Sequence, residues 1–217
     1  MLLRLLHNKK QSNTIERGRV TAALFYFSRM QVTYSGSANL DNIITLSELK
    51  GFLRVENTAE DTFITALRAA AVTWVEDYCN TRLGSYTATF RMDNFFNSSF
   101  PVGPLTALAH VKYDNSAGVE TTLPAGNYYY DIDSQPARIG FESPPTVEDF
   151  NLGGVRIETT AGWADTAIPE PFTQSIRMLV GHWYEHRTAV TQSGAIPRSL
   201  ALGVNALLSP LRYIAVV

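Results

Sequence analysis

Residues 59–81 read AEDTFITALRAAAVTWVEDYCNT, and this stretch carries the clearest periodicity in the chain. Its apolar positions are Phe63, Ile64, Leu67, Ala70, Ala71, Trp74, Val75 and Tyr78. Their three- and four-residue spacing places them along one side of a helix. Acidic residues at its start and Arg82 just beyond its end suit the helix dipole. The stretch predicts a long helix whose apolar stripe needs another helix or a sheet to cover it.

A shorter helix is predicted just before it, with Thr45 or Ser47 as the N-cap. Its apolar side chains fall on one side, at Leu46, Leu49, Phe52 and Leu53. Residues 55–58 read as a turn. Two helices joined by so short a turn predict an αα-hairpin.

The character of the sequence changes over residues 84–162. Short segments rich in β-branched and aromatic residues alternate there with turn signals such as Gly153-Gly154. The predicted strands are Tyr86–Met92, Ala107–Tyr113, Gly118–Thr122, Tyr128–Ile132, Arg138–Phe141 and Val155–Thr160. This region therefore predicts an antiparallel β subdomain.

Helical spacing returns after Pro169 and runs to about Thr188, with Pro171 in the first turn, where a missing N–H costs nothing. The apolar face consists of Phe172, Ile176, Leu179, Val180, Trp183 and Tyr184. A second short helix is predicted over Ala201–Leu208, and Leu211–Val217 reads as an extended apolar tail.

The predicted fold class is α+β: a helical bundle, made of the αα-hairpin plus the C-terminal helices, with an inserted antiparallel β subdomain. We expect five parts: a basic N-terminal arm and lead-in (1–43), a helical hairpin (44–83), the inserted β subdomain (84–162), C-terminal helices completing the bundle (163–209) and an apolar tail (210–217).

Charge is distributed unevenly along the chain. Residues 1–30 hold six basic residues and one acidic residue, whereas the rest holds twelve basic and nineteen acidic residues. The net charge of -2 gives no general case for nucleic-acid binding. A basic arm on an acidic body predicts contact with DNA or with a neighbouring subunit. The residues expected to make it are Arg4, Lys9, Lys10, Arg17 and Arg19.

Cys79 is the single cysteine, so an intrachain disulfide is impossible, which suits folding in a reducing cytoplasm. Its place on the inner stripe of the long helix predicts a small buried apolar residue and not a nucleophile. The sequence has no apolar run of the length of a membrane span, and its first residues do not form a signal peptide.

Three blocks, in order, resemble phage head–tail connector (adaptor) proteins of the gp6-like/gp8-like family. The first is Ile44–Val55, continued by Ala70–Tyr78 and Asn80–Leu83. The second joins Ile168–Pro171 to Leu179–Arg187, and the third is Leu202–Arg212. The resemblance spans about 44–212, leaves out the arm, and is weaker within the β region.

The resemblance implies a structural virion protein of the bacteriophage neck, made in the host cytoplasm. The family's members form homo-oligomeric rings, commonly of twelve copies, that dock beneath the portal protein. Such a ring would join the portal to the next head–tail or tail protein and would surround DNA without reading its sequence. No enzyme activity, catalytic residue, metal or cofactor is expected.

The family's C-terminal segment reaches toward the portal, and an apolar chain end is suited to capture a partner, for example by adding to a sheet. The residues expected to bind the portal are Leu211, Arg212, Tyr213, Ile214 and Val216. Deleting 211–217 is expected to leave the monomer folded and to abolish this binding.

Besides a DNA-binding module that uses the basic arm at 1–30, two alternatives remain. The nearer one is another ring of the same particle, a head-completion (stopper) or tail-terminator protein, although those rings are mostly β and lack a helical hairpin. The other is a zinc-dependent hydrolase, because His182-Trp183-Tyr184-Glu185-His186 fits the H-x-x-E-H pattern. A third zinc ligand would have to come from upstream, such as His110, since no acid follows Glu185 and no histidine follows His186.

Two further groups of residues resemble ligand sites, but the sequence favours a simpler interpretation of each. Asp131 and Asp133 lie on one strand face, but no surrounding turn supplies the oxygen ligands of a calcium site. Tyr128-Tyr129-Tyr130 could stack on nucleic-acid bases, but no basic residue lies between Lys112 and Arg138 to hold the phosphates. We therefore expect solvated carboxylates and buried or interface aromatics.

Overall fold

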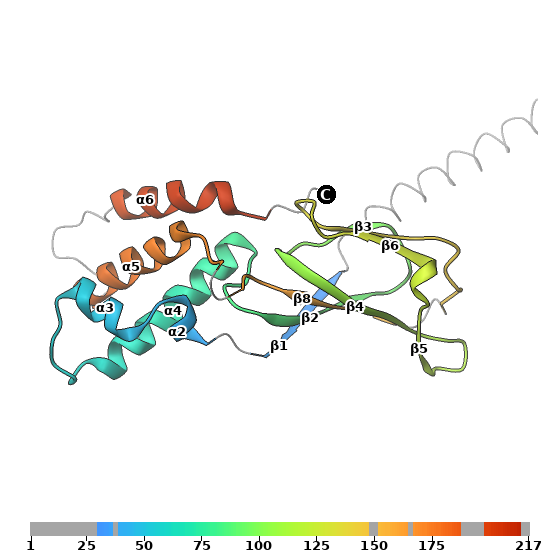
Figure 1. The fold of residues 1–217 in the computed structure, drawn as a ribbon, viewed down its shortest axis with the longest axis horizontal. Coiled ribbons are helices and arrows are strands. Elements are labelled where there is room, and N and C mark those ends of the chain that lie inside the picture. The colour runs from blue at the N-terminus through green and yellow to red at the C-terminus, as the bar shows by residue number, and fades with distance from the viewer. Residues whose placement is uncertain (1–29, 37–38, 148–151, 165–166, 188–197, 214–217) are drawn as a thin grey trace, which may run out of the picture.

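The computed structural model describes residues 30–36, 39–147, 152–164, 167–187 and 198–213. Helices gather at one end of an elongated molecule and strands at the other (Figure 1). Each end has its own core of buried side chains. None of the described helices combines the length and the apolar run that crossing a bilayer requires.

The predicted helical hairpin is present, preceded by a single turn, α2 (Leu40–Ile43). Helix α3 (Leu46–Leu53) begins at Thr45, whose hydroxyl accepts the backbone N–H of Glu48 while the Glu48 carboxylate accepts the N–H of Thr45. These hydrogen bonds lower the pKa of Glu48. Helix α4 (Asp61–Cys79) follows and ends on Asn80, which adopts the left-handed conformation that an asparagine tolerates at a helix terminus.

Helix α4 is rotated relative to the predicted stripe. Its buried residues are Ile64, Arg68, Ala71, Val72, Val75, Glu76 and Cys79, whereas Ala70 and Trp74 are exposed. The burial of Arg68 is possible because its Nη1 donates to the Asp41 carboxylate (2.5 Å) and to the Ile44 carbonyl oxygen (3.1 Å). A charged residue thus lies on the buried side of the helix, where the sequence pattern predicts apolar residues.

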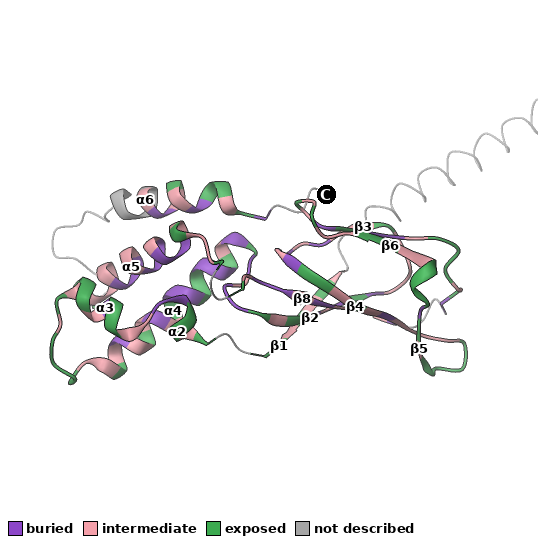
Figure 2. Cartoon of the chain, viewed as in Figure 1, coloured by how far each residue is buried: buried purple, intermediate pink, exposed green. Residues whose placement is uncertain are grey.

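Helices α5 (Glu170–Glu185) and α6 (Arg198–Leu208) complete the helical end, and a 3-10 turn, η2 (Ser209–Leu211), follows. Phe172, Ile176 and Val180 of α5 are fully buried against α4 and α6 (Figure 2). The predicted apolar face of α5 is confirmed, with Trp183 and Tyr184 at its partly buried margin.

The larger sheet is antiparallel and has the strand order β1-β2-β8-β4-β5. Its strands are β1 (Gln31–Ser35), β2 (Tyr86–Met92), β4 (Leu105–Asp114), β5 (Glu120–Thr122) and β8 (Val155–Ala161). Along β8 the residues alternate between buried and half-exposed, so one face is covered and the other carries polar side chains.

The smaller sheet has the order β3-β7-β6, with β3 (Ser98–Ser99), β6 (Tyr128–Asp131) and β7 (Arg138–Phe141). A short 3-10 turn, η1 (Ala125–Asn127), leads into β6. The buried faces of both sheets supply one apolar core, in which Phe90 meets Phe100 edge-on with ring centroids 4.7 Å apart.

The predicted fold class is wrong. The β region is not a small subdomain inserted into a helical bundle, because it consists of two antiparallel sheets with their own core. Moreover, β1 precedes the helices and pairs with β2, from Gln31 opposite Arg91 to Ser35 opposite Thr87. The larger sheet is therefore assembled from chain on both sides of the helical hairpin, and a single insertion at 84–162 could not produce it.

Candidate functional site

The last described residues of the chain are fixed where the helices meet the sheets. The backbone N–H of Tyr213 donates to the carbonyl oxygen of Cys79 (2.8 Å), and the side-chain amide of Asn80 donates to the carbonyl oxygen of Tyr213 (2.9 Å). The Tyr213 ring is buried against the backbone of Gly103, and burial raises the pKa of its hydroxyl. The chain is thus anchored at residue 213.

Arg212 reinforces this anchor from the solvent side. Its Nε donates to the carbonyl oxygen of Tyr78 (3.0 Å), and its guanidinium lies 4.6 Å from the centroid of the Tyr78 ring. Tyr78 in turn stacks on the exposed ring of Trp74, with centroids 5.1 Å apart. An aromatic and cationic stack therefore runs from α4 to the C-terminal residues.

The structure describes three of the five residues predicted to bind the portal. Leu211 packs against the helical core, and Arg212 and Tyr213 form the anchor. Ile214 and Val216 lie outside the described residues. The portal-binding role of all five stays a prediction, but up to Tyr213 the predicted tail is part of the folded chain.

The connection from α4 to β2 supports the anchor from beneath. Glu76 is buried there, accepts the backbone N–H of Leu83 (2.7 Å), and lies 4.0 Å from the Arg82 guanidinium. Desolvation raises the pKa of Glu76, although the hydrogen bond from the Leu83 N–H and the positive charge of Arg82 oppose the shift. Arg82 also lies over the ring of Tyr34 in β1, 4.0 Å from its centroid. Helix, connection and sheet are therefore linked by side chains as well as by backbone.

Sequence reasoning missed Asn80 and Gly103 as members of this junction. In the sequence, Asn80–Leu83 contributes only to the first block of the family resemblance. An asparagine just past the last helical residue signals a left-handed cap, but nothing local announces that its side chain will bind a carbonyl 133 residues further on.

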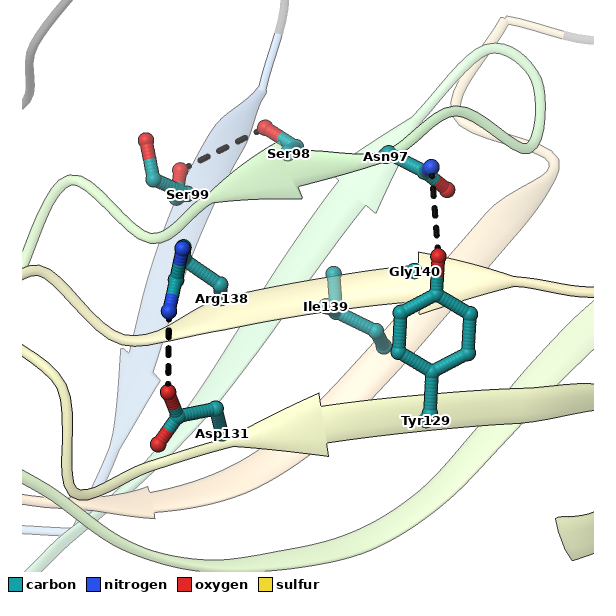
Figure 3. A pocket seen from close by; sticks show the side chains of 8 residues that line it. All are labelled: Asn97, Ser98, Ser99, Tyr129, Asp131, Arg138, Ile139 and Gly140. Carbon is teal, nitrogen blue, oxygen red and sulfur yellow. Dashed lines mark hydrogen bonds and ion pairs between the residues drawn. The ribbon is translucent and has the colours of Figure 1, made fainter.

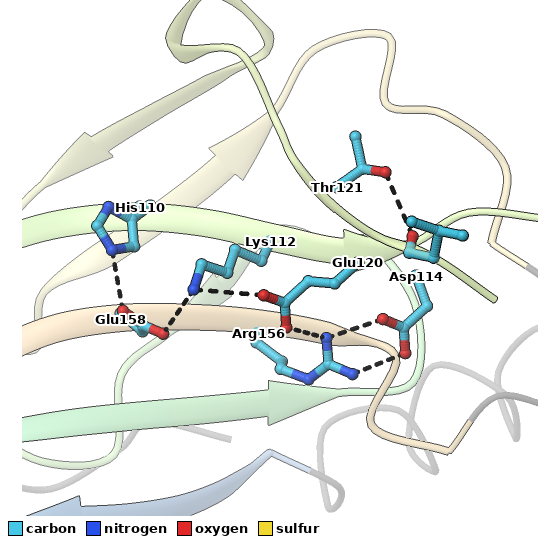
Figure 4. A network of polar contacts seen from close by, with 8 residues as sticks. His110, Lys112, Asp114, Glu120, Thr121, Arg156 and Glu158 are labelled. Carbon is cyan, nitrogen blue, oxygen red and sulfur yellow. Dashed lines mark hydrogen bonds and ion pairs between the residues drawn. The ribbon is translucent and has the colours of Figure 1, made fainter.

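A network of charged side chains covers the solvent face of the larger sheet near β5 (Figure 4). Arg156 of β8 binds both carboxylate oxygens of Asp114 (2.8 and 2.7 Å) and also Glu120 (2.9 Å). Lys112 contacts Glu120 and Glu158, at 3.4 and 3.3 Å, and these carboxylates raise its pKa. His110 lies 2.9 Å from Glu158, so the predicted upstream zinc ligand is paired within the sheet.

A hollow of about 510 Å³ lies on the outer face of the smaller sheet (Figure 3). The Tyr129 ring covers Gly140, where a Cβ atom would come within 2.2 Å of the ring. Arg138 pairs with Asp131 (3.1 Å) at the other end of the hollow. Tyr129, which is 59% exposed, and the paired Asp131 thus line the same hollow, whereas Tyr130, 47% exposed, lies on the other face of β6; an interface role for these tyrosines stays a prediction.

The H-x-x-E-H motif lies at the end of α5. The rings of His182 and His186 are 4.6 Å apart between centroids, and the N–H of His186 donates to the carbonyl oxygen of His182. Among the described residues, no three side chains of His, Cys, Asp or Glu converge in a way that could hold a metal ion. The motif therefore lacks the third protein ligand that a zinc site needs within this part of the chain.

The basic arm was predicted from residues near the start of the chain. Arg4, Lys9, Lys10, Arg17 and Arg19 all lie outside the described residues. Their predicted contact with DNA or with a neighbouring subunit stays a prediction.

Part of the chain matches a known protein family. Residues 43–121 match the family described as phage gp6-like head-tail connector protein. The matched stretch contains α3, α4, β2, β3, β4 and the start of β5, together with Asn80 and Gly103 of the junction. No curated protein matches the chain significantly.

Solved structures share the fold over most of the chain. A chain in the neck of an empty GTA particle, computed with C6 symmetry, matches with a TM-score of 0.70 and 23% identity, covering 87% of this chain and 98% of its own. A chain of the native gene transfer agent (GTA) virion matches with a TM-score of 0.67, 23% identity and the same coverage. The neck of the native particle, computed with C12 symmetry, gives 0.63 and 22%, again with 87% and 98% covered.

The matched family is described as a head-tail connector, and two of the three matched structures are described as particle necks. The family model confirms the sequence resemblance to phage gp6-like head–tail connector proteins over residues 43–121, and the solved structures show that the fold is shared over 87% of the chain.

Proposed function

We propose that this chain is a ring-forming subunit of a head–tail connector that joins the portal to the tail and surrounds the DNA channel. The observation that carries the proposal is the shared fold: 98% of a neck subunit, from particles treated with sixfold and twelvefold symmetry, has its counterpart in this chain. The connector family match covers the hairpin and the first strands independently.

The partners follow from that position. They are further copies of the chain, the portal protein, the next head–tail or tail protein, and DNA that passes without sequence specificity. The protein is synthesised in the host cytoplasm and is assembled into the virion neck. Its role is mechanical and not catalytic.

The charges of the β region support passage of DNA without retention. Of its four basic side chains, Lys112, Arg138 and Arg156 each form an ion pair with a carboxylate. Phosphate binding by lysine and arginine depends on charges that are free to replace counterions. A surface on which three of four cations are already paired offers less of that attraction.

The two ends of the chain have separate roles in the proposal. The arm, with Arg4, Lys9, Lys10, Arg17 and Arg19, contacts DNA or a neighbouring subunit. The C-terminus contacts the portal, with Leu211, Arg212 and Tyr213 fixing its point of departure and Ile214 and Val216 making the contact. The anchor limits where the last four residues can reach.

Cryo-electron microscopy of intact particles tests the proposal. We expect a ring of this chain directly beneath the portal. When the chain is missing, assembly should yield DNA-filled heads without tails. A position at the tail side of the neck would instead identify a stopper or tail terminator. A single copy per particle, or normal particles without the chain, would refute the proposal.

A further inference from the structure

The two sheets end on four edge strands that differ in length and charge. Strand β5 has three residues and β3 has two, and Glu120 of β5 is held by Arg156 and Lys112. Short, charged edges resist pairing with another chain. Strands β1 and β6 have five and four residues and no charged residue except Asp131, which is paired with Arg138.

The outer sides of β1 and β6 are open. Strand β1 pairs only with β2, and β6 only with β7, among the residues that the structure describes. Each therefore presents a row of backbone N–H and C=O groups without a strand partner there. Proteins that remain monomeric usually protect such edges with lysine, proline or a bulge.

The side chains of β6 also suit a protein contact. Tyr130 is opposite Ile139, which is buried, yet 47% of Tyr130 is exposed, so its side chain is only partly covered at this edge. Tyr129, on the other face, is 59% exposed. Both faces of this edge thus present tyrosine, a residue enriched in protein interfaces.

The two open edges belong to different sheets of the β region. Phe90 of β2 meets Phe100, the residue after β3, so β3 lies over the β1 side of the larger sheet. Strand β6 is at the far end of the smaller sheet from β3. It also follows β5 after only five residues, 123–127, which keeps it on the β5 side.

We propose that the β1 edge of one copy pairs with the β6 edge of the next copy. The inference rests on the proposed ring and identifies its lateral contact. Two different, mutually compatible edges of one subunit give a head-to-tail interface, which closes into a ring when the rotation per subunit allows it. The occupant of each edge is therefore a second copy of this chain, bound by strand addition.

Cysteine cross-linking in assembled particles tests the pairing. Paired strands lie about 5 Å apart, so a short bismaleimide should join a cysteine on β1 to one on β6 of the neighbour. Tyr130→Cys is combined in turn with Gln31→Cys, Thr33→Cys and Ser35→Cys, so that the register of pairing does not decide the outcome. The native Cys79 should not react, because it is fully buried and desolvation raises its pKa to about 11.

We expect at least one double variant to give a ladder of cross-linked chains extending to the full ring. Each single variant should give no cross-link, since a head-to-tail contact never brings two copies of one edge together. For the β1 position that gives a ladder, particles that mix chains carrying only that β1 cysteine with Tyr130→Cys chains should give dimers and nothing larger. A Thr33→Cys, Thr62→Cys double variant, with its second cysteine on the exposed side of α4, is the matched control and should give no ladder.

The outcomes separate this inference from the proposed function. A ring seen by microscopy, with no ladder from any of the three double variants, overturns the edge pairing and leaves the connector assignment intact. Dimers from a single variant show a symmetric contact and also overturn it, as does an equal ladder from the control. Absence of a ring in wild-type particles overturns the proposed function itself.

Discussion

The ring of Tyr213 lies so close to the backbone of Gly103 that a Cβ added to the glycine would come within 2.4 Å of the tyrosine Cε1 atom. Residues 110 positions apart in the sequence thus share one packing site at the junction of helices and sheets. The contact explains why a glycine occupies position 103, because any larger residue must displace the aromatic ring.

Gly103→Ala should therefore destabilise the protein by about 1–3 kcal/mol, the usual cost of overpacking. Tyr213→Ala should cost about 3–5 kcal/mol through the lost aromatic packing. Because the clash needs both groups, the double variant should be less destabilised than the sum of the two single effects. Urea unfolding of the four proteins measures the coupling, and simple additivity would show that the two residues do not share a site.

Truncations at two points should behave differently. Removing residues 214–217 leaves the Tyr213 anchor intact, so the monomer should keep wild-type stability and lose binding to portal-containing capsids. Removing 211–217 deletes the anchor and should also lower the unfolding midpoint, contrary to the expectation from sequence that this deletion leaves the fold unaffected. Thermal unfolding and capsid pull-down measure both. Wild-type capsid binding by the shorter truncation would contradict portal capture by Ile214 and Val216.

Removal of Arg156 should destabilise the larger sheet. The side chains of Arg156 and Asp114 are only 20% and 13% exposed, so Arg156→Met leaves a half-buried carboxylate without its cation. We expect a loss of about 2 kcal/mol, typical of hydrogen bonds to charged groups. Arg138→Met is the matched control, because that ion pair with Asp131 is exposed and should change stability little. Equal losses in the two variants would contradict this assignment.

Glu76 should make stability depend on pH. Its pKa is raised above the ordinary value of 4.5 in the folded protein, so its contribution is most favourable below pH 4.5 and declines as the pH rises through the folded-state pKa. Glu76→Gln keeps an acceptor for the N–H of Leu83 and removes the titration. The stability of the variant relative to wild type should therefore increase between pH 4 and pH 8, as measured by urea unfolding. A constant difference would show that Glu76 titrates normally.

Local sequence signals located most elements but not their assembly. Tyr86–Met92 and Arg138–Phe141 were predicted with the bounds that the structure has, because each combines β-forming residues with clear turn signals. Strand β1 was read as an extended lead-in, since only Val32 and Tyr34 of its five residues are apolar and its partner is more than 50 residues away. That missed pairing is the reason the fold class was wrong.

The prediction of which side of α4 is buried was wrong for a related reason. Counting apolar residues placed Trp74 inside and gave Arg68 no inner position. Arg68 can be buried because its guanidinium donates to the Asp41 carboxylate and to the Ile44 carbonyl oxygen. These partners come from a segment whose conformation the sequence did not specify. The C-terminal anchor is similar: Asn80 and Tyr213 are each ordinary in their local context, and only the fold brings them together.

The position of β1 ahead of the helices has a mechanical consequence. The chain crosses between the sheets and the helices three times, at 36–39, 80–85 and 162–169, and the Tyr213 anchor adds a fourth attachment. Tension applied between the two ends of the subunit is divided among these parallel links, whereas an inserted domain would hang from two. In the proposed connector, load between the helical end and the β end of a subunit would therefore be shared by four attachments.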